Sequence, residues 1–243
     1  MEQTKLRILD NAPIASDVWR MTLVGDCTAI ERPGQFINIQ LDGRFLRRPI
    51  SVCDWDKDWI TIIYKVLGHG TDDMTRYEAG KDLDILVGLG NGFDTAPSGP
   101  RPLLIGGGVG TPPLYGLAKK LVSEGKNPQV VLGFNGKEDI FYEKEFWDLG
   151  CPVSVTTVDG SYGTKGFVTD ALPPSFSYFY TCGPMPMLKA VFRSTEGSGQ
   201  FSFEERMGCG FGACMGCSCK TITGYKRICK DGPVLLKEEI LWD

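Results

Sequence analysis

The sequence predicts a multidomain fold in which an antiparallel β-barrel is followed by an α/β doubly wound domain and a small C-terminal domain. Three observations predict it. Short alternating runs fill the first 98 positions, strand and helix patterns alternate from residue 101, and five of the nine cysteines lie between residues 209 and 229. We therefore expect domains over residues 1–98, 99–193 and 194–243 of this 243-residue chain.

The first segment contains short runs in which apolar and polar residues alternate. Residues 18–24, 35–41 and 59–66 are such runs, and turn residues separate them. A period of two is typical of strands with one buried face, and strands at this spacing favour an antiparallel barrel or a sandwich. Residues 90–100, rich in Gly and Pro, are then expected to form a linker.

The second segment alternates strand and helix patterns. Strands are expected at residues 103–105, 129–134, 153–158 and 178–182, and helices at 114–124, 144–149 and 185–193. Strands that alternate with helices pair in parallel, so this order predicts a doubly wound sheet. Residues 194–243 are weakly periodic, and a piece of this size needs a metal centre to hold its shape.

Composition and charge exclude several classes of function. Apolar residues make up 42% of the chain, charged residues 23%, and the net charge is −4. Because no basic stripe is present, nucleic acid is not expected as a partner. No run reaches the length of a membrane span and residues 1–10 lack the apolar core of a signal peptide, so we expect no membrane association and a cytoplasmic protein. Clustered thiols in that reducing compartment are typical of metal sites or catalysis.

The cysteine cluster carries the most specific motif. Cys209, Cys214 and Cys217 follow the C-x4-C-x2-C spacing of plant-type ferredoxins, and Cys229 stands eleven residues further on. A [2Fe–2S] cluster needs four thiolates from a compact loop, whereas zinc sites pair separate C-x2-4-C knuckles. We predict these four cysteines as cluster ligands, with structural zinc or buried thiols as the alternatives. Cys219 is expected to be a spare thiol, although the spacing leaves it open as a substitute for Cys229.

Two turns in the second segment are candidates for binding a nicotinamide nucleotide. One follows the strand at 103–105 and the other follows the strand at 178–182, at the carboxyl ends where open α/β sheets bind ligands. A glycine-rich packing turn and a buried cysteine are the alternatives. Acidic residues in 134–139 favour NADH over NADPH. The candidate residues are Gly107, Gly108, Gly110, Thr111, Cys182, Gly183 and Pro184.

Arg47, Arg48, Pro49, Ile50 and Ser51 lie between two predicted strands of the first segment. An arginine fork binds phosphate through two parallel hydrogen bonds, and serine supplies a small donor. A surface arginine pair before proline would be unremarkable alone. Its position ahead of the nucleotide turn and the cysteine cluster makes it a candidate phosphate site.

The order of these motifs resembles the ferredoxin-NADP reductase superfamily, in which a barrel binds flavin and the next domain binds the nicotinamide nucleotide. The whole chain is more specifically similar to the electron-transfer subunits of class 1B dihydroorotate dehydrogenase. The matching motifs are LRRPIS at 46–51, LGNGF at 89–93, GGGVGTPPL at 106–114, DGSYGTKGFVTD at 159–170, CGPMPMLKA at 182–190 and EERMGCGFGAC at 204–214.

This resemblance implies an oxidoreductase subunit with FAD, a [2Fe–2S] cluster and NAD(H). Electrons would pass between NAD, FAD, the cluster and the FMN of a separate catalytic subunit in pyrimidine biosynthesis, in a heterotetramer with two copies of each subunit. No general acid, base or nucleophile is required of this chain. The residues implied to contact FAD are Arg48, Pro49, Ile50, Ser51, Ile63, Tyr64, Lys65, Gly70 and Thr71.

Two other functions stay open at this point. A reductase with the same cofactors could serve an oxygenase, a hydrogenase or a ferredoxin. A nucleotide-regulated binding module held together by zinc would show the same cysteine cluster without redox chemistry.

Overall fold

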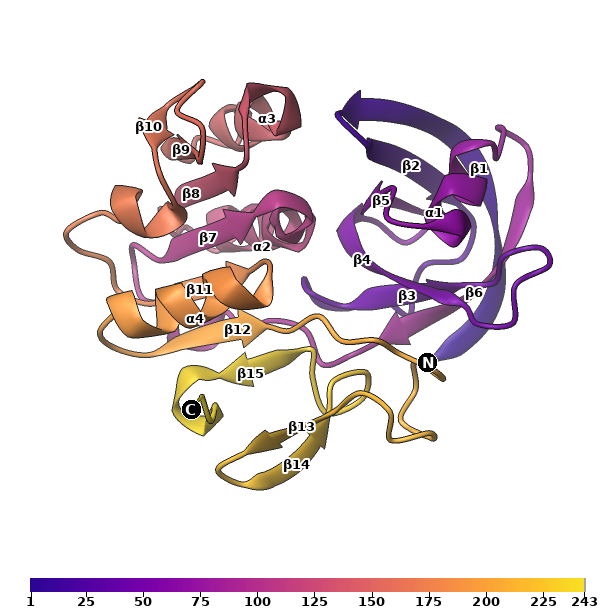
Figure 1. The fold of residues 1–243 in the computed structure, drawn as a ribbon. Helices are drawn as coiled ribbons and strands as arrows, with labels where there is room; N and C mark the ends of the chain where they lie inside the picture. Colours follow the sequence, from indigo (N-terminus) through magenta and orange to yellow (C-terminus); the bar gives the residue numbers. More distant parts are fainter. Residues whose placement is uncertain (243) are drawn as a thin grey trace.

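The computed structural model describes residues 1–242 and contains a closed six-stranded barrel, a seven-stranded sheet and a two-stranded hairpin (Figure 1). The barrel stands beside the large sheet, and the hairpin lies below them at the C-terminal end of the chain (Figure 1). The predicted fold class is therefore confirmed. The barrel, rather than the sandwich, is the architecture of the first segment.

The barrel strands follow the order β1-β2-β5-β4-β3-β6. Their bounds are β1 Glu2–Ala15, β2 Val18–Val24, β3 Phe36–Ile39, β4 Arg48–Trp55, β5 Trp59–Lys65 and β6 Asp82–Leu89, and helix α1 spans His69–Thr75. Every second side chain of β6 is buried, beginning at Leu83. That alternation fills the barrel interior with aliphatic side chains, and the side chains between them point to the outer face of the barrel.

The large sheet follows the order β10-β9-β8-β7-β11-β12-β15, and only β15 runs antiparallel to its neighbour. The bounds are β7 Leu103–Gly107, β8 Gln129–Phe134, β9 Val153–Thr157, β10 Thr164–Lys165, β11 Phe179–Cys182, β12 Gly199–Ser202 and β15 Val234–Leu236. The chain winds outward from β7 to β10 and then returns to place β11 on the other side of β7. The topological switch point therefore lies between β7 and β11.

Helices cover both faces of this sheet, as a parallel sheet requires. They are α2 Thr111–Ser123, α3 Glu143–Asp148 and α4 Met185–Ser194, and single 3₁₀ turns occur at Ala96–Ser98, Gly108–Gly110, Lys137–Asp139, Val168–Ala171 and Lys237–Glu239. Leu104 packs with Leu114 and Leu117 of α2. Ile105, the next residue along the strand, packs with Leu188 of α4. None of the helices in the described part of the chain is both long and apolar enough to cross a membrane.

The C-terminal segment contributes to two sheets. Strands β13 (Ser218–Thr221) and β14 (Gly224–Arg227) form the separate hairpin, whereas β12 and β15 extend the large sheet. The sequence showed no clear periodicity for β12 and β15. Residues beyond 193 therefore complete the second sheet before and after the cysteine cluster.

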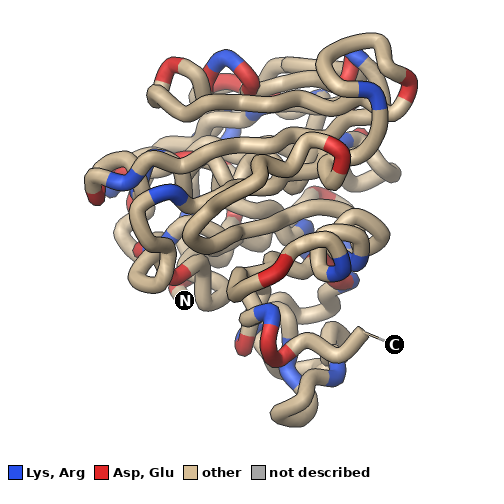
Figure 2. Tube along the Cα trace, turned by 90° about the vertical axis from the view of Figure 1, so that its left-hand side faces the viewer, with Lys and Arg blue, Asp and Glu red and all other residues tan. Residues whose placement is uncertain are grey.

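The barrel and the large sheet meet along helix α2 and strand β4. A Cβ on Gly116 would lie 2.8 Å from the carbonyl oxygen of Cys53, so the helix and the strand touch backbone to backbone. Lys119 Nζ lies 2.6 Å from Asp54 Oδ1 across this seam. Acidic and basic residues are interspersed along the chain in the view of Figure 2.

Candidate functional site

The two turns predicted to bind a nucleotide are in contact at the switch point of the large sheet. Strands β7 and β11 are paired so that Gly106 lies opposite Cys182, and the turns that follow them meet at the carboxyl edge. A Cβ on Gly110 would lie 2.3 Å from the carbonyl oxygen of Cys182. Glycine is therefore required at this position because the neighbouring backbone occupies the space of a side chain.

Gly107 and Gly183 lie against the flexible Met187 side chain, which can move, rather than against backbone. A Cβ on Gly107 would lie 2.4 Å from Met187 Sδ, and one on Gly183 would lie 2.5 Å from Met187 Cε. Gly108 differs, because its φ is +50° and a Cβ there would meet nothing within 4 Å. The backbone of Gly108 is thus the part of the turn that a ligand can approach.

Thr111 and Cys182 are placed differently from the glycines. The Thr111 side chain is fully buried, and its Oγ1 has no hydrogen-bond partner among the described residues. Burial raises the pKa of the Cys182 thiol to about 12, against a hydrogen bond with Ser202 that lowers it. Cys182 is therefore a neutral thiol at physiological pH. Pro184 is exposed and stands directly before helix α4.

The proposed flavin motif lies at the start of strand β4. The Arg48 guanidinium donates to the carbonyl of Leu46 over 2.7 Å and lies against the first turn of α1. A Cβ on Gly70 would be 2.4 Å from Arg48 Nε. No carboxylate within the described residues forms an ion pair with Arg48, so its positive charge is free beside the backbone of Gly70 and Thr71. This arrangement suits a phosphate.

The other residues of this motif divide between the two faces of the barrel wall. Ile50 packs against the barrel core, whereas Pro49 pairs across the strands with Asn38 and Ser51 pairs with Phe36. Cross-strand partners share a face, so Pro49 and Ser51 lie on the outer face with Asn38 and Phe36.

Strand β5 carries the remaining residues implied to contact flavin. Ile63 is buried at the seam between the barrel and helix α2, and Lys65 is half-buried at the strand end. Tyr64 is 1% exposed inside the barrel, and its hydroxyl donates to Asn11 Oδ1 over 2.9 Å. The Tyr64 side chain therefore faces away from any ligand on the outer surface, and only its backbone is available there.

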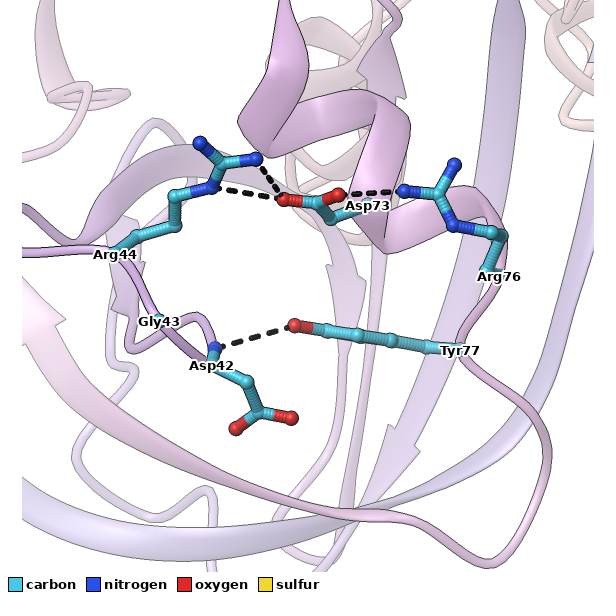
Figure 3. A pocket seen from close by; sticks show the side chains of 6 residues that line it. All are labelled: Asp42, Gly43, Arg44, Asp73, Arg76 and Tyr77. Atoms are coloured by element: carbon cyan, nitrogen blue, oxygen red, sulfur yellow. Dashed lines mark hydrogen bonds and ion pairs between the residues drawn. The ribbon is translucent and has the colours of Figure 1, made fainter.

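A hollow of about 480 Å³ lies beyond the other end of α1 (Figure 3). Asp73 bridges Arg44 and Arg76 above it, and the Tyr77 hydroxyl accepts a hydrogen bond from the Asp42 amide below (Figure 3). A hydrogen bond from Arg44 holds the pKa of the Asp73 carboxyl below its ordinary value. Both guanidinium groups are thus already paired, and none of the predicted site residues lines the hollow.

The cysteine loop points backbone donors at its sulfur atoms. The amides of Ala213 and Cys214 lie 3.2 and 3.4 Å from Cys209 Sγ, and the amide of Gly216 lies 3.5 Å from Cys214 Sγ. The amide of Cys229 lies 3.4 Å from Cys217 Sγ, which brings the distant cysteine back to the loop. Such donors favour thiolate ligands and tune a bound cluster.

The electrostatics of these thiols fit a ligand set. Burial alone would raise the pKa of Cys209, but amide donors from Cys214, Phe211 and Ala213 bring it down to about 6. Burial raises the pKa of Cys229 to about 12, and the adjacent Cys217 sulfur adds to that increase. Two free thiolates packed together in this way repel each other. This repulsion is relieved when both sulfurs bind the same positively charged metal centre.

A zinc ion and a two-iron cluster place different demands on these cysteines. A structural zinc ion takes four ligands around one point, whereas the two irons of a [2Fe–2S] cluster divide the four thiolates between them. Among the residues that the structure describes, no three His, Cys, Asp or Glu side chains gather closely enough to hold a single metal ion.

Cys219 lies on strand β13 and lines a small hollow with Met185, Glu205 and Trp242. The hydrogen bond that joins the far cysteine to Cys217 comes from Cys229 rather than from Cys219. The predicted division into four ligands and a spare thiol is thus compatible with the fold.

Asn38 was missed by the sequence analysis, although it lies between the flavin motif and the cysteine loop. Its Nδ2 donates to the carbonyl of Cys209 over 3.2 Å. The available sequence signal was a lone asparagine inside the apolar run Phe36–Ile39, a residue type that is depleted in strands.

Comparisons with known proteins first define the class. Residues 104–193 match the oxidoreductase NAD-binding domain, and residues 204–241 match the iron-sulfur cluster binding domain of dihydroorotate dehydrogenase B. A ferredoxin reductase of a carbazole 1,9a-dioxygenase (19% identity, TM-score 0.69, 79% of this chain and 64% of that one) shares the fold. The structure of an NADH-dependent reduced ferredoxin-NADP oxidoreductase is more similar, at 31% identity and a TM-score of 0.88 over 98% of this chain and 90% of that one. The chain is thus an oxidoreductase of the ferredoxin reductase type with an iron–sulfur domain.

Curated relatives then give the family. The dihydroorotate dehydrogenase B (NAD(+)) electron transfer subunit of Geobacillus sp. is 43% identical, over 99% of this chain and 99% of its own length. The subunits of the same name from Fusobacterium nucleatum (95% of each chain) and Listeria innocua (99% of each chain) are 43% and 42% identical. This chain belongs to the family of dihydroorotate dehydrogenase B electron transfer subunits.

Proposed function

We propose that this protein carries electrons between NAD and the catalytic subunit of a dihydroorotate dehydrogenase, through FAD and a [2Fe–2S] cluster. The observation that carries the proposal is the docking of the cysteine loop on the outer face of the barrel wall that presents the flavin motif. Pro49 of that motif is paired with Asn38, and Asn38 is bonded to Cys209. One continuous contact thus joins the two candidate cofactor sites.

The flavin is proposed to begin at the barrel end, where Arg48 opens strand β4 beside the first turn of α1, and to extend from there along the outer face of β4. Arg48 would bind its phosphates, with the backbone of Gly70 and Thr71 opposite. Pro49 and Ser51 would contact it from the outer face, Ile50 through its backbone, and Lys65 from the end of β5. Tyr64 and Ile63 would contribute main-chain groups, because both side chains are buried.

The cluster is proposed to be held by Cys209, Cys214, Cys217 and Cys229, with Cys219 as the spare thiol. NAD is proposed to bind at the switch point, where its pyrophosphate would approach the backbone of the 107–111 turn and its nicotinamide would lie beside the turn at 182–184. The neutral Cys182 thiol would border the nicotinamide without acting as a nucleophile.

The bound groups together supply the conversion between the two-electron hydride chemistry of NAD and the one-electron chemistry of a cluster. The chain's own residues bind and orient them. The FMN and the dihydroorotate site are proposed to lie in a partner subunit, in an assembly of two copies of each chain in the cytoplasm. Boundaries near residues 98 and 193 are proposed for the three functional units, with β12 and β15 completing the nucleotide sheet.

A visible absorption spectrum of the purified chain tests the cofactor assignment. Flavin and [2Fe–2S] bands that bleach on addition of NADH are expected, whereas a colourless protein that contains zinc would defeat the proposal. The isolated chain should not reduce NAD with dihydroorotate until the FMN-containing subunit is added. Turnover by the isolated chain would show that the division of labour is wrong.

A second function is favoured by one observation. The structural similarity to an NADH-dependent reduced ferredoxin-NADP oxidoreductase covers 98% of this chain, so a ferredoxin is a candidate acceptor. Measuring NADH oxidation with a ferredoxin and, separately, with the FMN-containing subunit distinguishes the two. Faster turnover with ferredoxin would favour this second function.

A further inference from the structure

Strand β3 presents one polar side chain on the outer wall of the barrel. Ile37 and Ile39 are fully buried in the barrel core, so Asn38, between them, points to the opposite face. Asn38 is nevertheless only 1% exposed. The group that covers it is the backbone of the cysteine loop.

The contact between Asn38 and this loop is close on both of its sides. Asn38 Nδ2 donates to the carbonyl oxygen of Cys209 over 3.2 Å. A Cβ on Gly210 would lie 2.3 Å from the same nitrogen, so a larger residue there would displace the Asn38 amide from its hydrogen bond. The first candidate cluster ligand is therefore placed by a barrel side chain.

The same asparagine is also tied to the flavin motif. Asn38 and Pro49 are cross-strand partners. The backbone carbonyl of Asn38 accepts a hydrogen bond of 3.3 Å from Arg47 Nη1, and Arg47 is itself paired with Asp84 of β6. The part of β3 that contacts the cysteine loop is thus held in place by its two neighbouring strands, β4 and β6.

A purely structural role explains this residue poorly. Asn38 Oδ1 is buried, and no described residue donates a hydrogen bond to it. A buried acceptor without a partner carries a penalty, and an aliphatic residue would avoid it within the apolar β3 strand. This free-energy penalty is offset only if the Asn38 amide makes an interaction that an aliphatic side chain could not make, and its hydrogen bond to the Cys209 carbonyl is such an interaction.

We propose that Asn38 is a positioning residue that holds the Cys209–Gly210 backbone against the flavin-binding wall and so sets the separation between the flavin and the [2Fe–2S] cluster. This inference rests on the proposed function. The cluster holds one electron at a time, so the second electron can leave the reduced flavin only after the cluster has passed the first to the flavin proposed in the partner subunit. The N–H proton of the reduced flavin goes to solvent as the flavin returns to its oxidised form. The distance that Asn38 fixes governs this step and leaves hydride transfer from NADH untouched.

The test compares Asn38→Ala with Gln35→Ala. Gln35 precedes the same strand, is 8% exposed and bonds to the carbonyl of Gly90 and to the amides of Glu31 and Arg32, none of which belongs to the cysteine loop. Stopped-flow absorbance separates flavin bleaching by NADH from the later bleaching of the cluster. Asn38→Ala should slow only the second phase, and Gln35→Ala should slow neither, even if it lowers the melting temperature.

Iron release to a chelator gives a readout that is independent of turnover. Losing the amide bond should speed iron release by about fivefold, the factor that corresponds to about 1 kcal/mol for one hydrogen bond. Asn38→Asp keeps the shape but, at a pH where its carboxyl is ionised, cannot donate to the Cys209 carbonyl, and its negative charge should then lower the reduction potential of the cluster. Restoration of the second phase by this variant would overturn the proposal.

A double-mutant cycle with Gly210→Ala completes the test. The added methyl group collides with the Asn38 amide, so Gly210→Ala should impair the flavin-to-cluster phase less in the Asn38→Ala background than in the wild type. Additive effects, or an Asn38→Ala protein with wild-type kinetics and iron retention, would refute the positioning role. A wild-type chain without flavin or cluster would instead refute the proposed function.

Discussion

Glycine serves different purposes in the nucleotide turn and in the cysteine loop. Gly110 has an ordinary helical φ of −81° and is required because the Cys182 backbone lies where a side chain would be. Gly210 and Gly212 have φ values of +80° and +92°, and Cys214 beside them is exposed. Tertiary packing alone thus accounts for the glycine at position 110. The glycine at position 210 combines a tertiary contact with Asn38 and a positive φ, a local conformation that a bound cluster would stabilise.

The largest expected effect is on the nucleotide turn. Gly110→Ala forces the backbone of two strands apart, and we expect the rate of flavin reduction by NADH to fall about a hundredfold, as an ångström of misplacement does. Gly125→Ala, just beyond the other end of α2, meets no neighbouring atom and is the control. It should lower stability through its φ of +75° but leave the rate unchanged. Equal rates for both variants would contradict a pre-shaped turn.

Removal of the cluster should loosen only the cysteine loop. In Cys209→Ser, we expect amide exchange across residues 208–217 to rise by on the order of thirtyfold, because metal ligation contributes folding free energy to such a loop. Exchange in the buried strand Leu103–Gly107 should stay at its wild-type rate. Hydrogen exchange with mass-spectrometric detection measures both, and equal protection of the loop without the cluster would show that packing holds it.

A smaller effect is expected at the seam between the barrel and the nucleotide sheet. The Asp54 side chain is 16% exposed and that of Lys119 is 40% exposed, so Lys119→Met should lower stability by about 0.5–1 kcal/mol and Tm by about 1–4 °C. The matched control is Lys120→Met, which removes an ion pair with Glu124 inside the same helix. If calorimetry shows an equally large fall in Tm for Lys120→Met, the ion pair between Lys119 and Asp54 adds no stability to the contact between the domains.

The smallest effect concerns acid stability under the cysteine loop. Burial raises the pKa of Asp84, but hydrogen bonds from Arg47 and Gln3 outweigh it and leave the pKa below the ordinary value. A carboxylate with a lowered pKa stabilises the fold above the unfolded pKa of about 4, and this contribution disappears as pH falls through the folded pKa. Denaturant melts should therefore lose stability more steeply below about pH 4 in the wild type than in Asp84→Asn. If stability falls equally steeply with pH in both proteins, the Asp84 carboxylate makes no such contribution.

Local patterns predicted most of the fold, because strands such as β2 and β8 carry their own period and their own turn residues. Strands β12 and β15 escaped prediction since they have only four and three residues and depend on pairing with each other across more than 30 positions. Strand β1 as a whole was not among the predicted strands for a related reason, as only two of its 14 residues are buried.

The candidate site divides in the same way. The cysteine spacing and the glycine turns are visible in the sequence because each is a short, continuous motif. Tyr64 points into the barrel because its face of strand β5 is turned toward the barrel core. The role of Asn38 depends on a contact with a residue 171 positions away. Neither is contained in any local run of residues.

The pairing of β12 with β15 has a mechanical consequence. The amide of Phe203 donates to the carbonyl of Pro233 over 2.9 Å, so the chain that leaves the nucleotide sheet for the cysteine loop returns to the point of departure. The cysteine segment is therefore tethered at both ends and cannot travel as a swinging arm between donor and acceptor. An electron therefore has to pass through a segment that stays in place, and the acceptor must bind beside that segment to receive it.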